Sequence, residues 1–89
     1  MELILPIFVR PKGSREEEVT LDDCTIKPMI FFTVDNAEKL EEDGKSITLF
    51  DSGNCSFKCN LPIDVFLAKR KEALKQDILF AHQVLNGEV

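Results

Sequence analysis

The residue types best suited to chemistry in this chain are its three cysteines and single histidine: Cys24, Cys55, Cys59 and His82. Together they could form a Cys₃His zinc site, and a thiol beside an imidazole could act as a nucleophile. Zinc draws its sulfur ligands to within about 4 Å of one another. Cys55 and Cys59, four residues apart on one strand, lie about 13 Å apart. We therefore expect no metal, no cofactor, no catalytic residue and no enzymatic activity.

The same cysteines indicate a reducing compartment. A disulfide needs Cα atoms less than about 7 Å apart, and an odd number of cysteines does not form a disulfide framework. The first residues, from Met1 to Arg10, contain an early acid and Pro6 but no basic segment before an apolar one, so they do not read as a signal peptide. No stretch approaches the ~20 apolar residues of a membrane span. We expect a cytoplasmic protein without membrane contact.

Basic side chains offer one alternative function, contact with nucleic acid. The candidate phosphate contacts are Arg10, Lys12, Arg15, Lys71 and Lys75. A formal net charge of −5 opposes non-specific attraction to phosphate backbones. A nucleic-acid-associated accessory or regulatory protein is therefore kept as an alternative.

Acidic side chains offer a second alternative. Residues 16–18 and 35–43 are rich in Asp and Glu, and could mimic nucleic acid in an inhibitor of a basic protein. A calcium loop is not predicted, because Ala37 and Lys39 stand where an EF-hand needs oxygen ligands. We expect residues 35–45 to form a loop, with at most one helical turn, that closes on the turn Asp43-Gly44.

The elements that would position these residues follow from periodicity. Alternation of polar and apolar residues predicts strands at roughly 3–10, 19–21, 25–34, 46–50 and 55–59, and a spacing of 3.6 predicts a helix at roughly 62–86. We expect one domain, residues 1–89, of class α+β. Its sheet is an antiparallel β-meander of four or five strands, twisted or curled into a partial barrel, with the long C-terminal helix packed on it.

This succession of strand, glycine turn, strand and helix resembles short bacterial and phage β-meander proteins. Similar strand pairing occurs in SH3-like and Sm-like barrels, although Sm-like proteins usually carry their helix at the N-terminus. No functional residue follows from the resemblance. The helix is expected to cover the sheet through Ile63, Phe66, Leu67, Leu74 and Ile78. The strands are expected to add Ile4 or Leu5, Phe8, Ile30, Phe32, Ile47, Leu49 and Phe57.

The predicted helix is too long for its domain. At 1.5 Å per residue it measures about 37 Å, against a radius of gyration near 12 Å for a chain of this length. Either it breaks near Asp77, or its apolar end packs against another chain. The candidate association surface is Ile78, Leu79, Phe80, Val84 and Leu85. The sequence thus favours a non-enzymatic module for protein–protein interaction, either with itself as a homodimer or with another protein.

Overall fold

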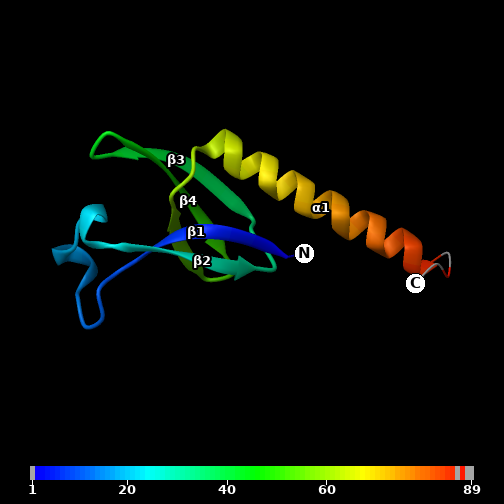
Figure 1. Ribbon diagram of the computed structural model, residues 1–89, viewed down its shortest axis with the longest axis horizontal. Helices are drawn as coiled ribbons and strands as arrows, with labels where there is room; N and C mark the ends of the chain where they lie inside the picture. The colour runs from blue at the N-terminus through cyan, green and yellow to red at the C-terminus, as the bar shows by residue number, and fades with distance from the viewer. Residues whose placement is uncertain (1, 86, 88–89) are drawn as a thin grey trace.

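The computed structural model describes residues 2–85 and 87 as one antiparallel sheet, two short 3₁₀ helices and one long α-helix (Figure 1). The elements in chain order are β1 (Leu3–Val9), η1 (Glu16–Glu18), η2 (Leu21–Asp23), β2 (Thr25–Phe31), β3 (Asn36–Glu42), β4 (Lys45–Ser52), β5 (Cys55–Cys59) and α1 (Ile63–Leu85). The strand order is β2-β1-β5-β4-β3. This confirms the α+β class and the meander-like sheet followed by a C-terminal helix.

The sheet is strongly curled around a cluster of phenylalanine rings. Phe31 of β2 and Phe50 of β4 have ring centroids 5.0 Å apart, although β1 and β5 lie between these strands. In a flat sheet, three strand spacings would separate them by about 14 Å. Phe57 of β5 lies 5.0 Å from Phe31, and Phe66 of α1 lies 5.1 Å from Phe50. The curled sheet and the helix therefore share one core.

The side of β2 that enters this core is opposite to the prediction. Phe31 pairs with Leu3 and is buried, whereas Ile30 and Phe32 are exposed. Since residues 29–32 are all apolar, alternation could not tell which face turns inward, and one step of register exchanges the two faces. Of the other expected strand positions, Leu5 and Ile47 are buried, Phe8, Leu49 and Phe57 are half-buried, and Ile4 is exposed.

The acidic segment expected to be a loop is instead strand β3. Seven of its residues pair with β4, from Asn36 opposite Asp51 to Glu42 opposite Lys45. The turn between the strands is Asp43-Gly44, and both residues have positive φ, 54° and 73°. This is the conformation of a two-residue hairpin turn. Edge strands often carry charged side chains because these discourage pairing with other sheets. The charge that suggested a loop is therefore consistent with the position of β3 at the edge of the sheet.

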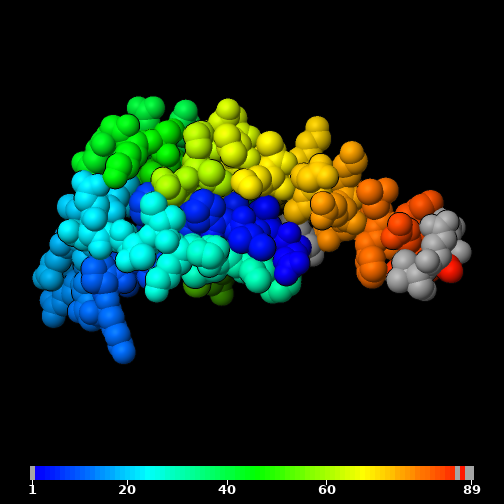
Figure 2. All heavy atoms as spheres, in the orientation of Figure 1, coloured from blue at the N-terminus to red at the C-terminus, as the bar shows by residue number. Residues whose placement is uncertain are grey.

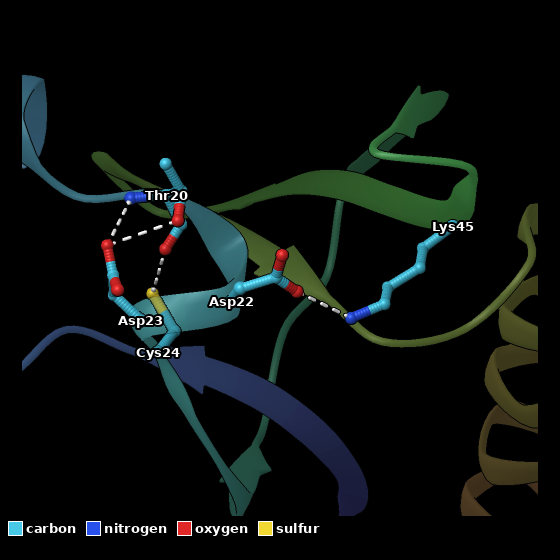
Figure 3. Close-up of polar contacts among 5 residues, drawn as sticks. All are labelled: Thr20, Asp22, Asp23, Cys24 and Lys45. Carbon is cyan, nitrogen blue, oxygen red and sulfur yellow. Dashed lines mark hydrogen bonds and ion pairs between the residues drawn. The ribbon is translucent and has the colours of Figure 1, made fainter.

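The short strand expected at residues 19–21 is also wrong, because residues 21–23 form the 3₁₀ helix η2. Thr20 donates from its backbone N and from Oγ1 to Oδ2 of Asp23, both at 3.1 Å (Figure 3). The Lys45 ammonium pairs with Asp22 at 2.8 Å and ties η2 to the start of β4. Local side-chain hydrogen bonds of this kind favour turns over extended strands. Leu21 is buried beneath the turn.

Helix α1 is unbroken from Ile63 to Leu85, so no break occurs at Asp77. Its core-facing residues are Phe66 and Ala73, both buried. Leu67, Leu74 and Ile78, which were expected to cover the sheet, are exposed. Both sectors of the helix are apolar, so the pattern alone could not decide which of them meets the sheet.

Polar contacts fix the helix and the segment before it to the strands. Arg70 Nε donates to the carbonyl oxygen of Val34 at 2.7 Å. Thr48 Oγ1, fully buried in β4, donates to the carbonyl oxygen of Leu61 at 2.5 Å. The Asn60 amide donates to the carbonyl of Pro6 at 2.9 Å. These bonds satisfy backbone groups at the helix–sheet junction and set the direction in which α1 leaves the sheet.

The molecule is elongated because the helix continues beyond the sheet (Figure 1). Its principal extents are 53 × 27 × 20 Å and its radius of gyration is 15.6 Å, compared with about 12 Å for a compact chain of this length.

Replacing Arg70 by Met should destabilise the fold. Val34 is only 1 % exposed, so losing the guanidinium leaves its carbonyl without this donor. An unsatisfied buried group costs about 1–3 kcal/mol. Urea denaturation should show this loss in Arg70→Met. In the control Lys71→Met, on an exposed neighbour, the free energy of unfolding should change by less than about 0.5 kcal/mol. Equal stability of the two variants would contradict a structural role for the Arg70 hydrogen bond.

Candidate functional site

The part of α1 that follows its last buried residue, Ala73, projects away from the sheet. We call residues 74–85 the overhang; all of them are exposed, and both views show them beyond the strands (Figures 1 and 2). The overhang carries large apolar side chains, among them Phe80 at 59 % exposure and Leu85 at 86 %. Within the part of the chain that the structure describes, no helix is long and apolar enough to cross a membrane.

Most of the predicted association surface lies on one broad side of the overhang. At about 100° per residue, Phe80 and Val84 extend the line of Phe66 and Ala73 that packs on the sheet. Ile78 and Leu85 form a second line, rotated by about 100–120° from Val84, and Asp77 lies between the two lines. Leu79 is rotated by about 100° from both Phe80 and Ile78, so it lies on the side of the helix opposite Asp77. Four of the five predicted residues therefore border one broad stripe about 160° wide, which also contains Asp77, and the exposed Leu74 extends it toward the sheet.

A second exposed apolar surface, which the sequence analysis missed, lies on the sheet. On the hairpin β1–β2, Ile4 pairs with Ile30, Pro6 with Pro28, and Phe8 with Ile26. Directly opposed residues share a face, and it is the face turned away from Leu3 and Phe31 of the core. We call it the outer β1–β2 face. Its members, with Phe32 just after β2, are Ile4, Pro6, Phe8, Ile26, Pro28 and Ile30.

The outer β1–β2 face is partly open to solvent, although its Phe8 is half-buried and lines a cavity beside the η1–η2 segment. Ile4, Ile26 and Ile30 are each about half exposed, and Phe32 is 68 % exposed. Atoms of β1 and β2 occupy the middle of the view in Figure 2, with the overhang projecting to one side. The sequence does contain the alternation that predicts this face, because residues 4, 6 and 8 and residues 26, 28 and 30 are all apolar. It was hidden because the intervening positions are mostly apolar too.

The predicted phosphate contacts do not form one surface. Arg10 follows β1, and Lys12 and Arg15 lie in the connection to η1, at one end of the molecule (Figure 1). Lys71 and Lys75 lie one turn apart on α1, which runs toward the other end. A continuous basic path of the kind that tracks a nucleic-acid backbone is not formed by these five residues.

A cavity of about 260 Å³ lies between the η1–η2 segment and the sheet. Its charged lining is mixed, with Arg10 and Lys58 near Glu16 and Glu42. Lys58 pairs with Glu42 at 3.3 Å. Cys24 also lines the cavity, and its thiol donates to the carbonyl of Thr20 at 3.5 Å. Because the charges of both signs are interspersed, the lining matches neither an anion nor a cation as ligand.

The four residues considered for zinc or thiol chemistry are distributed over three elements. Cys24 follows η2, Cys55 and Cys59 are at opposite ends of β5, and His82 is on the overhang. Among residues 2–85 and 87, no group of three or more His, Cys, Asp or Glu is arranged to hold a metal ion. Cys59 is fully buried, and its thiol packs in the core cluster.

None of the protein families, curated proteins or solved structures compared with this chain matches it. Function is therefore inferred from the surfaces of the chain itself.

Burial gives Cys59 a measurable pH signature. Desolvation raises the pKa of its thiol from 9.0 to about 11, against a smaller lowering by Lys69. Below pH 9 both the folded and the unfolded chain keep the proton. Between pH 9 and 11 only the unfolded chain releases it, so this thiol should lower the free energy of unfolding by about 1.4 kcal/mol per pH unit.

Denaturant titrations at pH 8 and 10.5 test this effect. The loss of stability between the two pH values should be smaller in Cys59→Ala than in the parent chain, by about 2 kcal/mol. Cys55→Ala is the matched control, because Cys55 is exposed on the same strand, and should behave like the parent. An unchanged pH dependence in Cys59→Ala would contradict the raised pKa.

Proposed function

We propose that this chain is a non-enzymatic module that associates with itself through the apolar stripe of the overhang. The observation that carries the proposal is that α1 continues unbroken for residues 74–85 beyond its last buried residue, with exposed large apolar side chains at residues 74, 78–80 and 84–85. A helix that only covered its own sheet could end near Ala73. Large exposed apolar patches are typical of interaction sites.

The area of the stripe supports a specific contact. If a fully exposed large side chain presents about 200 Å², the exposed fractions of Leu74, Ile78, Phe80, Val84 and Leu85 amount to roughly 600 Å². The largest patch on a typical monomer is about 300–600 Å² and is often functional. The stripe is therefore at the upper end of what monomeric proteins expose.

A second copy is the partner that we propose, because every copy presents the same stripe and most oligomers of soluble proteins are symmetric. Binding to a different protein is the alternative within the same class of function. The separation of Arg10, Lys12 and Arg15 from Lys71 and Lys75 gives no support to the nucleic-acid alternative. We place the module in the cytoplasm, where unpaired cysteines such as Cys24, Cys55 and Cys59 are usual.

Replacing Phe80 by Glu should dissociate the assembly. Burying a phenylalanine contributes about 1.5–3 kcal/mol, and a charge at the same position adds a desolvation cost. We therefore expect the dissociation constant to rise at least tenfold. Size-exclusion chromatography with light scattering, over a range of concentrations, should give the parent chain twice the mass of one copy and Phe80→Glu the mass of one.

Gln83→Glu is the matched control, because it adds the same charge on the same turn without removing an apolar side chain. It should keep the parent's mass. Circular dichroism should show the same helix content in all three proteins. A parent chain that remains monomeric at every concentration would overturn the proposal.

A further inference from the structure

We infer that the stripe of the overhang docks on the outer β1–β2 face of a second copy, so that two copies exchange helix ends. This inference rests on the proposed self-association and names the surface that receives the stripe. It joins the two exposed apolar surfaces of the chain, which are otherwise unrelated features.

The layering of the sheet supports this pairing. An apolar sheet face is usually buried by another layer of structure, and a helix is a common one. The face that carries Leu3, Leu5 and Ile7 lies in the core with Phe66 and Ala73 of α1. Among the described residues, no such layer covers Ile4, Ile26 and Ile30, which remain about half exposed, whereas Phe8 lines the cavity beside the η1–η2 segment.

The overhang cannot supply that layer to its own sheet. Helix α1 is continuous to Leu85, and it is held on the core side by Phe66, Ala73 and the Arg70 hydrogen bond to Val34. Reaching the outer face of the same sheet would require α1 to bend sharply, and it carries no proline or glycine between Ile63 and Leu85 that would allow a kink. A helix end from a second copy meets no such restriction.

The dimensions of the two surfaces agree. The twelve residues of the overhang extend for about 18 Å at 1.5 Å per residue. On the outer β1–β2 face, Ile4 to Phe8 extend for about 14 Å and Ile26 to Phe32 for about 20 Å, at 3.4 Å per residue. The length of the overhang therefore matches the length of the patch to within about 4 Å.

The area favours helix-on-sheet contact over contact between two overhangs alone. The stripe presents roughly 600 Å², which is below the about 800 Å² that each partner buries in a standard stable interface. The exposed fractions of Ile4, Ile26, Ile30 and Phe32 add roughly 450 Å². With both surfaces used, each copy contributes about 1,000 Å², which passes that threshold and leaves neither patch exposed.

The reciprocal arrangement can be tested with one variant on each surface. Ile30→Glu alters the outer β1–β2 face, and Thr25→Glu, exposed on the other face of β2, is its matched control. Phe80→Glu alters the stripe. We expect Ile30→Glu and Phe80→Glu each to have the mass of one copy in light scattering, at concentrations where the parent chain and Thr25→Glu have twice that mass.

Mixing the two monomeric variants distinguishes the modes of contact. In the mixture, the intact stripe of Ile30→Glu can dock on the intact sheet face of Phe80→Glu, which restores one of the two reciprocal contacts. The heterodimer should therefore be weaker than the parent dimer, but its dissociation constant should be at least tenfold below that of the homodimer of either variant. Native mass spectrometry of one isotope-labelled variant mixed with the other identifies the heterodimer directly.

Three other outcomes would overturn the inference, and they differ in whether the proposed self-association survives. If Ile30→Glu remains dimeric while Phe80→Glu is monomeric, overhangs pair with each other, and self-association stands without the sheet contact. If both variants are monomeric and do not combine, each surface contacts its own counterpart. If the parent chain is itself monomeric, both the proposed function and the docking mode fail. Matching circular dichroism spectra and denaturation midpoints exclude misfolding of a variant as the cause.

Discussion

Packing around Phe50 is the interaction on which the rest of this structure depends. Its ring lies within 5.5 Å, centroid to centroid, of Phe31, Phe57 and Phe66. These rings come from β2, β5 and α1, so one side chain joins both halves of the sheet to the helix. Because the backbone links β1 to β5 only near Ile7 and Cys59, with the Asn60–Pro6 hydrogen bond beside them, the rings provide much of the contact that keeps the sheet curled.

The curled core also explains why apolar surface remains outside it. Four aromatic rings fill the space between the curled strands and the first half of α1, so the described residues complete one core and leave much of the outer β1–β2 face open. The helix emerges from that core in a direction set by Phe66, Ala73 and Arg70, and it carries its remaining apolar residues into solvent. Both exposed surfaces are thus consequences of how one small core is closed.

The buried thiol and the charged cavity lining lie apart from the apolar side chains of the overhang. Cys59, the most buried of the thiols, is held neutral by desolvation, and the charged side chains around the cavity near η1 and η2 are interspersed in sign. Phe80 and Val84 of the overhang, by contrast, continue the core-facing line of the helix. The self-association that we propose rests on shape and apolar area, and it uses no reactive group.

Local pattern in the sequence determined the class of the protein, the position of four strands and the C-terminal helix with its apolar end, but it left open a break near Asp77. Two periodicities and a few turn residues, such as Asp43-Gly44, are sufficient for this because they act over short stretches of chain. Tertiary structure alone decided which face is buried wherever both faces are apolar, as at Ile30 and Phe31 or at Phe66 and Leu67. It also made residues 36–42 a strand, because only pairing with β4 stabilises so charged a segment in extended form. Strand register and ring packing bring together residues that are distant in the chain. Periodicity is a property of short stretches, so it does not predict which distant residues come into contact.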